Sequence, residues 1–122
     1  MRKILFLLLL TSTFTFSQQY FFYVAAESDD TVSLINFDGE TATEVERIPV
    51  GIMKTEIEGP HGLTVDPSGE YWYLSLAHGN PYGSLVKYST ATNRPVDKTT
   101  VGLFPATMQI SELTGLLYCV NF

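Results

Sequence analysis

The sequence has a single cysteine, and charged residues make up only 16% of the chain. One cysteine cannot form an internal disulfide, so side-chain packing must stabilise the fold. Cys119 stands between Tyr118 and Val120 in an apolar run. This setting predicts a small core residue and not a nucleophile.

Motifs of common catalytic chemistry are absent as well. The chain contains no Gly-x-Ser-x-Gly elbow, no phosphate-binding loop, no Cys-x-x-Cys-His haem attachment and no pair of cysteines. Glu27, Asp29 and Asp30 stand close together, but a calcium site needs about six to eight oxygens in a defined loop. We therefore expect no catalysis, and the sequence defines no metal motif.

An apolar run at residues 4–10 follows the basic start Met1-Arg2-Lys3 and is too short to span a bilayer. Small polar residues follow as far as Ser17. This layout predicts a secretory signal peptide over residues 1–17, cleavage before Gln18, and a periplasmic or extracellular location. An N-terminal membrane anchor is the alternative. After cleavage we expect no membrane span.

Basic residues are scarce in the exported part. Without Arg2 and Lys3, five basic and thirteen acidic side chains remain, a net charge of −8, and eleven of the acids lie in residues 27–70. Such a surface repels phosphate backbones, so we expect no nucleic-acid partner. Two readings explain this negative charge: solubility in the exported compartment, or a specific cation site. Solubility is favoured.

What the sequence does contain is a series of short β-type runs separated by turn signals. Residues 20–26, 31–37, 43–50, 71–76, 84–88 and 95–101 are predicted strands, and Pro49 marks its strand as an edge strand. No segment keeps a helical period. The predicted class is all-β.

An internal repeat organises these runs. Residues 59–75 read as a strand, an Asp-Pro-Ser-Gly turn and an apolar strand, and a degraded copy begins at Pro105. Tyr23, Tyr73 and Tyr118 stand at matching positions, 50 and 45 residues apart. A period of about 40–50 residues with four strands per unit is typical of a β-propeller blade.

The repeat resembles a known family in its motifs. Gly-Pro-His-Gly at residues 59–62, Asp-Pro-Ser-Gly at 66–69, Thr-Val-Ser-Leu-Ile-Asn at 31–36 and Ile-Pro-Val-Gly at 48–51 are similar to the YVTN-type propeller repeat. That repeat is shared by YncE-like proteins and cytochrome d1 haem-domain-like propellers. The likeness covers residues 20–122, with Tyr-Cys-Val-Asn at 118–121 where the family reads Tyr-Val-Thr-Asn.

The resemblance implies an all-β propeller of four-stranded antiparallel blades, seven in number, of which about two are present. Residues 18–50 would supply the last three strands of a first blade, 59–101 a complete blade, and 105–122 the start of the next. We expect the chain to be an N-terminal fragment of a longer protein, because a propeller needs roughly four to eight blades.

Both histidines are predicted on one face of such a fold. Antiparallel alternation puts the loops at 27–30, 51–60 and 77–83 on the same side, with His61 opening an innermost strand and His78 in a loop. They are the candidate cofactor-binding residues, and the acids Glu27, Asp29, Asp30, Glu56 and Glu58 share their face. For His61 a structural role, in which the side chain caps neighbouring backbone groups, is favoured over ligation.

The expected function is therefore an exported binding scaffold that presents this face to a protein or a small ligand. No cofactor is the favoured expectation. The alternative is a redox role like that of haem-binding or cytochrome-associated relatives of the family, with haem as the cofactor and His61 or His78 as the residue involved.

Overall fold

The computed structural model describes residues 18–53, 55–79 and 81–122. Nine strands and no helix form within these residues, which confirms the all-β class. The strands are β1 (Tyr20–Ala26), β2 (Thr31–Phe37), β3 (Ala42–Pro49), β4 (Pro60–Val65), β5 (Tyr71–Leu76), β6 (Ser84–Ser89), β7 (Arg94–Thr100), β8 (Pro105–Ile110) and β9 (Leu117–Asn121). The predicted signal peptide, residues 1–17, lies outside the described residues. Nothing in the described ranges forms a helix capable of crossing a membrane.

The predicted strands agree with the observed ones to within one residue at each end. β1, β2 and β5 match in full, whereas β3 and β7 begin and end one residue earlier than predicted. The residues after them, Val50 and Val101, still donate backbone hydrogen bonds, to the carbonyls of Asp30 and Gly83 at 2.9 and 3.0 Å. Pairing therefore continues briefly beyond the regular ladder at both places.

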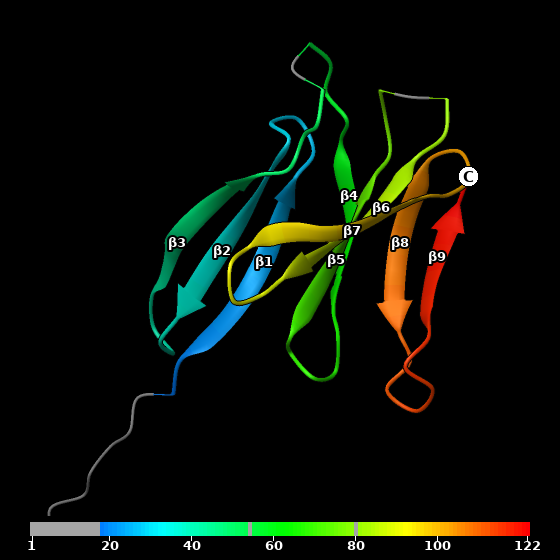
Figure 1. Ribbon diagram of the computed structural model, residues 1–122. Helices are drawn as coiled ribbons and strands as arrows, with labels where there is room; N and C mark the ends of the chain where they lie inside the picture. The colour runs from blue at the N-terminus through cyan, green and yellow to red at the C-terminus, as the bar shows by residue number, and fades with distance from the viewer. Residues whose placement is uncertain (1–17, 54, 80) are drawn as a thin grey trace, which may run out of the picture.

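The strands form three antiparallel sheets in chain order (Figure 1). Sheet A has the order β1-β2-β3, sheet B the order β4-β5-β6-β7, and sheet C the order β8-β9. β3 is an edge of sheet A, as Pro49 predicts. β4 contacts β1 on one side and β8 on the other, so sheet B lies between its two neighbours.

The sheets repeat one another in detail. The register of β2 with β3 shifts between Leu34 and Ile35, and that of β6 with β7 shifts at the matching place, between Lys87 and Tyr88. A second irregularity follows Pro60 in the β4–β5 pair, and a third follows Pro105 in the β8–β9 pair. These shared β-bulges are stronger signs of an internal repeat than the sequence spacing, because a bulge changes strand twist at a defined residue.

The interface between sheets A and B is filled by aromatic rings. Trp72, with none of its surface exposed, stacks on Tyr23 at 4.8 Å and on Tyr88 at 4.0 Å between ring centroids. The side-chain oxygen of Asn93 accepts hydrogen bonds from the Tyr23 hydroxyl (2.9 Å) and the Trp72 indole (3.2 Å). Burial raises the pKa of Tyr88 to about 12, with a further contribution from the charge of Glu58. Trp72 therefore belongs to the core of the molecule.

Sheets B and C approach each other through their backbones. A Cβ at Gly62 would lie 1.7 Å from the carbonyl oxygen of Ala106, so only glycine fits there. The Ser75 hydroxyl accepts a hydrogen bond from the Gly62 amide at 2.7 Å and donates to the Ala106 carbonyl at 3.2 Å. β4, β5 and β8 are thereby joined by one buried hydroxyl.

Cys119 is less enclosed than the sequence suggests. It lies half-buried on β9, an edge of the two-stranded sheet C, and burial raises the pKa of its thiol. The neighbouring Tyr118 and Val120 are exposed. A raised pKa keeps the thiol protonated at neutral pH, which agrees with a packing role and not with a nucleophile.

Candidate functional site

Two ends of the molecule differ in the kind of connection that they carry. At one end, upper in Figure 1, lie the β1–β2, β3–β4, β5–β6 and β7–β8 connections together with the chain end at Phe122. We call this the loop end. The opposite end, which we call the turn end, carries the β2–β3, β4–β5, β6–β7 and β8–β9 turns. The two predicted site histidines belong to the loop end.

His61 and His78 pack against the same phenyl ring. The ring of Phe104 lies 5.2 Å from the His61 ring and 5.0 Å from the His78 ring, with interplanar angles of 69° and 71°. His61 lies on β4 and His78 follows β5, whereas Phe104 precedes β8. Residues from sheets B and C therefore meet at this point.

Sheet A contributes Glu27. The Nε2 atom of His78 lies 3.0 Å from Oε1 of Glu27, a pair that links the β1–β2 connection to the β5–β6 connection. The hydrogen bond to His78 is the main reason why the pKa of Glu27 is lowered, and the charges of His61 and His78 add to it. Both side chains are about half exposed, so this pair contributes little net stability.

The His78 ring is also fixed by the backbone beneath it. A Cβ at Gly59 would lie 2.2 Å from Cδ2 of His78, so the ring packs directly on that glycine. The backbone amide of His78 donates to the carbonyl of Glu58 at 2.8 Å. Glycine at position 59 is thus required both for its φ of +62° and for the space that the imidazole occupies.

Phe104 holds an unusual backbone conformation. Its φ is +38°, in the left-handed region that bulky residues rarely adopt. It occupies the position equivalent to Gly59: each precedes a proline, and each carbonyl accepts a hydrogen bond from a residue just past the paired strand, Ala77 or Phe122. In sheet C, an aromatic residue therefore occupies the position that glycine occupies in sheet B.

The acids predicted to share this face have structural roles. The Asp30 carboxylate accepts hydrogen bonds from the backbone amides of Glu58 (3.0 Å) and Gly59 (2.9 Å). Glu58 is only 2% exposed, and its carboxylate accepts from the amides of Ile52 and Met53. These two carboxylates thus hold the long β3–β4 connection in place and are not open ligands. Asp29 and Glu56 are exposed at the same end.

The side chain of His61 does not take the capping role that the sequence favours. Its side chain is exposed, and within the described ranges its imidazole caps no backbone group. Contact with Phe104 takes the place of the expected cap. No group of three or more His, Cys, Asp or Glu residues in the described part of the chain could hold a metal ion. Whether either histidine binds a cofactor stays a prediction.

Sequence reasoning missed Phe104 and the support given by Gly59. The available signal was the repeat itself, because aligning Pro60 with Pro105 sets Gly59 opposite Phe104. A residue other than glycine at a position where the repeat needs a positive φ is a reason to look for a function.

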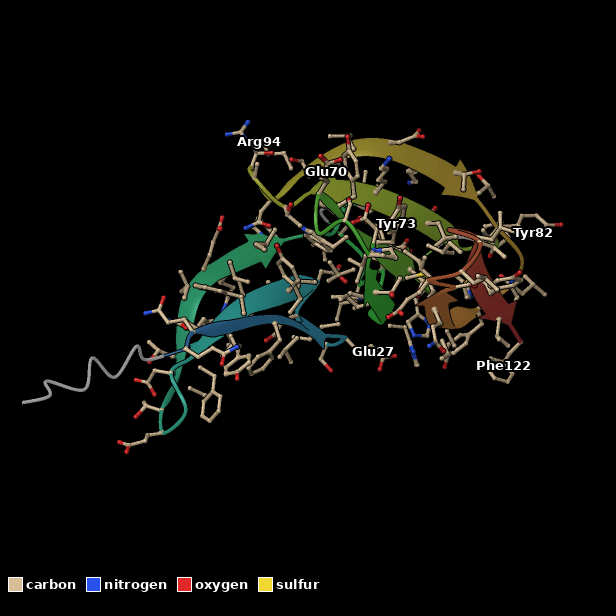
Figure 2. All side chains as sticks on the ribbon, turned by 90° about the horizontal axis from the view of Figure 1, so that it is seen from below. Glu27, Glu70, Tyr73, Tyr82, Arg94 and Phe122 are labelled. Atoms are coloured by element: carbon tan, nitrogen blue, oxygen red, sulfur yellow. The ribbon has the colours of Figure 1, made fainter. Side chains whose placement is uncertain are left out.

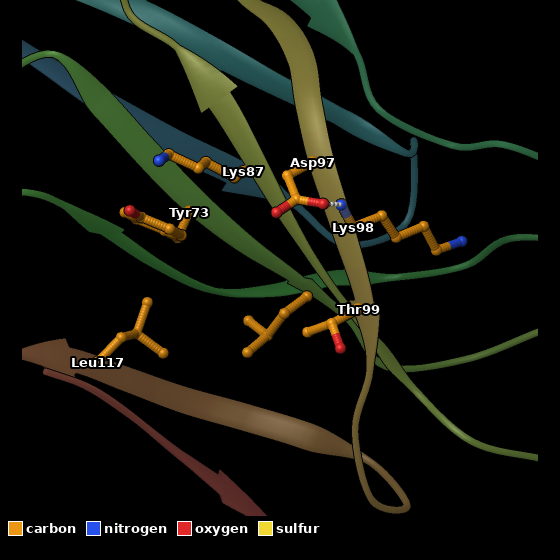
Figure 3. A pocket seen from close by; sticks show the side chains of 7 residues that line it. Tyr73, Lys87, Asp97, Lys98, Thr99 and Leu117 are labelled. Atoms are coloured by element: carbon orange, nitrogen blue, oxygen red, sulfur yellow. Dashed lines mark hydrogen bonds between the residues drawn. The ribbon is translucent and has the colours of Figure 1, made fainter.

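A second candidate is a cavity of about 180 Å³ between the outer strands of sheet B and β9. It is lined by Tyr73, Leu85, Lys87, Asp97, Lys98, Thr99 and Leu117. Figure 3 shows Tyr73, Thr99 and Leu117 around the hollow, with the Lys98 side chain pointing away from it. Lys87 is held by Tyr71, whose ring centroid lies 3.7 Å from its ammonium nitrogen. Most of the exposed wall surface is apolar although several lining residues carry polar groups, so this cavity resembles a packing gap beside sheet C more than a binding site.

Neither a protein-family model nor a curated protein matches this chain.

Proposed function

We propose that this chain is the N-terminal part of an exported YVTN-type β-propeller of seven blades, which acts as a binding scaffold and not as an enzyme. Sheet B would be a complete blade, sheet A a blade without its innermost strand, and sheet C the start of the next blade. Its loop end would be the surface that receives a ligand or a protein partner.

The repeated β-bulges support the propeller. Sheets A and B share the register shift between their last two strands, and sheets B and C share the irregularity after the proline that opens each of them. Such agreement is expected of successive blades, whose strands have to twist alike in order to pack face to face.

The observation that carries the binding role is the meeting of His61, His78, Glu27 and Phe104 at one end. Loops from successive blades converge at a propeller's channel mouth, and ligands bind preferentially where loops converge on a rigid scaffold. Large apolar side chains are exposed there too, on the connections between strands: Ile52, Ile57, Tyr82 and Leu103. Tyr82 reaches outward on the side of β8 and β9 (Figure 2). Exposed apolar groups of this kind are typical of interaction surfaces.

Site-specific photo-crosslinking tests this role in cells that produce the full chain. A benzophenone side chain placed at Tyr82, on the loop end, should give a discrete crosslinked product. The same group at Leu113, which is 95% exposed on the turn end, serves as the matched control and should give none. Equal crosslinking at both positions, or at neither, would contradict a docking role of the loop end.

The alternative is a redox role, which haem absorption tests independently of crosslinking. A haem-binding full-length protein would show a Soret absorption band that disappears when a ligating histidine is replaced. We expect no such band. A stoichiometric haem signal lost in a His61→Ala variant would replace the scaffold proposal with the redox one.

A further inference from the structure

The conformation of Phe104 points to a binding role for its ring. A bulky residue at φ +38° is strained, whereas Gly59 adopts the equivalent conformation freely. Glycine would therefore suit position 104 better if the backbone were all that mattered. The ring is half-buried and is set edge to face against both imidazoles, so three aromatic rings gather at one place on the loop end. Aromatic faces attract cations through the ring quadrupole.

Glu27 gives this ring cluster a negative charge. Its carboxylate is ionised at neutral pH, and the hydrogen bond to His78 lowers its pKa further below the ordinary value. Its one ion-pair partner in the part of the chain that the structure describes is His78, which compensates the charge only when protonated. When the imidazole is neutral, a carboxylate stands unbalanced beside aromatic rings, which favours a cationic ligand.

The neighbouring carboxylates restrict what kind of cation fits. Asp30 and the buried Glu58 already accept hydrogen bonds from backbone amides. A primary ammonium group or a metal ion needs several oxygen or nitrogen acceptors, and no group of three or more His, Cys, Asp or Glu residues in the described part of the chain could hold a metal ion. A quaternary ammonium group has no N–H to satisfy and is held by rings and a nearby charge alone.

We propose that the loop end binds a quaternary ammonium group on the exposed surface of the ring cluster formed by His61, His78 and Phe104, beside the Glu27 carboxylate. This inference rests on the proposed function, because it names the ligand chemistry of the end proposed as the docking surface. The ammonium group could be carried by a free solute or by a lipid headgroup, and the experiment separates these sources.

The test titrates the full chain with choline while the ring proton resonances of His61 and His78 are followed by NMR. Saturable shifts of both histidines are expected. The neutral isostere 3,3-dimethyl-1-butanol has the same shape without charge, and ethanolamine carries a primary ammonium. Each should bind about tenfold more weakly than choline. The absence of saturable shifts, or equal affinity for either control compound, would overturn the proposal.

Variants assign the binding to the cluster. Phe104→Gly should weaken choline binding about tenfold with only a small change in melting temperature, because the relief of backbone strain offsets the lost ring contacts. Phe104→Tyr, which keeps an aromatic ring, should retain binding. Glu27→Gln should weaken it, whereas the same charge change at Glu70, on the turn end, should not. Unchanged affinity in Phe104→Gly would overturn the assignment.

Vesicle sedimentation then identifies the source of the group. Co-sedimentation with phosphatidylcholine vesicles but not phosphatidylglycerol vesicles, reversed by free choline, indicates a lipid headgroup. Binding of free choline without sedimentation indicates a solute. If choline fails to bind while crosslinking at Tyr82 persists, this inference falls and the scaffold function stands. Loss of the crosslink as well would remove both.

Discussion

The two interfaces of sheet B are built in different ways. Towards sheet A, the buried Trp72 lies between two tyrosines, and Asn93 bonds to rings of both sheets. Towards sheet C, glycine and a serine hydroxyl bring backbones into contact near the strand starts, while a cavity of about 180 Å³ remains near the outer strands. The contact with sheet A is therefore held by ring packing, and the contact with sheet C by the close approach of backbones.

The largest effect is expected at the aromatic interface. Trp72→Ala removes a fully buried indole and leaves a large hole between two rings, which should cost about 3–5 kcal/mol of unfolding free energy. Chemical denaturation of the full chain measures this loss. Leu117 stands at the equivalent position in β9 and is half-buried. Leu117→Ala should therefore cost only about 1 kcal/mol, and equal losses would contradict the difference between the interfaces.

A comparable loss is expected where sheets B and C touch. Gly62→Ala places a methyl group against the Ala106 carbonyl, which is backbone and cannot turn aside, so the sheets must separate. We expect a cost of about 3 kcal/mol, at the upper end of overpacking effects. Gly69→Ala is a useful comparison, because a Cβ there meets nothing but the residue has a φ of +74°. It should cost about 1 kcal/mol through backbone strain alone.

Removal of the Asn93 side chain, which accepts hydrogen bonds from rings of both sheets, should have a smaller effect. Asn93→Ala leaves the Tyr23 hydroxyl and the Trp72 indole without their acceptor, and Glu46 loses a donor at 2.7 Å. Unsatisfied buried groups of this kind cost about 1–3 kcal/mol. Asn93→Asp combined with Glu46→Gln keeps the acceptor without setting two carboxylates together, and it should restore part of the loss, as judged from the melting temperature. If this double variant is as unstable as Asn93→Ala, the acceptor role assigned to Asn93 is wrong.

The smallest effect concerns the exposed Glu27–His78 pair. The pKa of Glu27 is lowered from its ordinary value of 4.5, so the ionised form is favoured by folding. Its contribution to stability is present above pH 4.5 and is lost as the pH falls through the lowered value. Melting temperatures of the parent and of Glu27→Gln should therefore converge towards acid pH. A gap that widens below pH 4.5 would contradict this sign.

The fold was predictable because its signals are local. The apolar runs at Tyr20–Ala26 and Tyr71–Leu76 and the turn at 66–69 each depend on a few adjacent residues, and their strands agree with the structure. Strand ends differed by one residue where pairing fades gradually, as at Val50. The loop-end placement of both histidines followed from strand alternation.

The details of the site were not predictable, since they depend on contacts between distant segments. The roles of Asp30 and Glu58 as acceptors for backbone amides need the folded β3–β4 connection. The contact of the His61 ring with Phe104, in place of the predicted cap, arises from the docking of sheet C on sheet B. No spacing in the sequence encodes a distance between side chains on different sheets.

The cluster at the loop end draws on all three sheets, with Glu27 from the first, the histidines from the second and Phe104 from the third. No sheet alone contains the site, so it comes into existence only after the last of them has docked. A ligand that binds there would hold the sheets together, and its stabilisation would grow with the logarithm of its concentration above the dissociation constant. Occupancy would then report that assembly is complete, because a partly folded chain lacks some residues of the site.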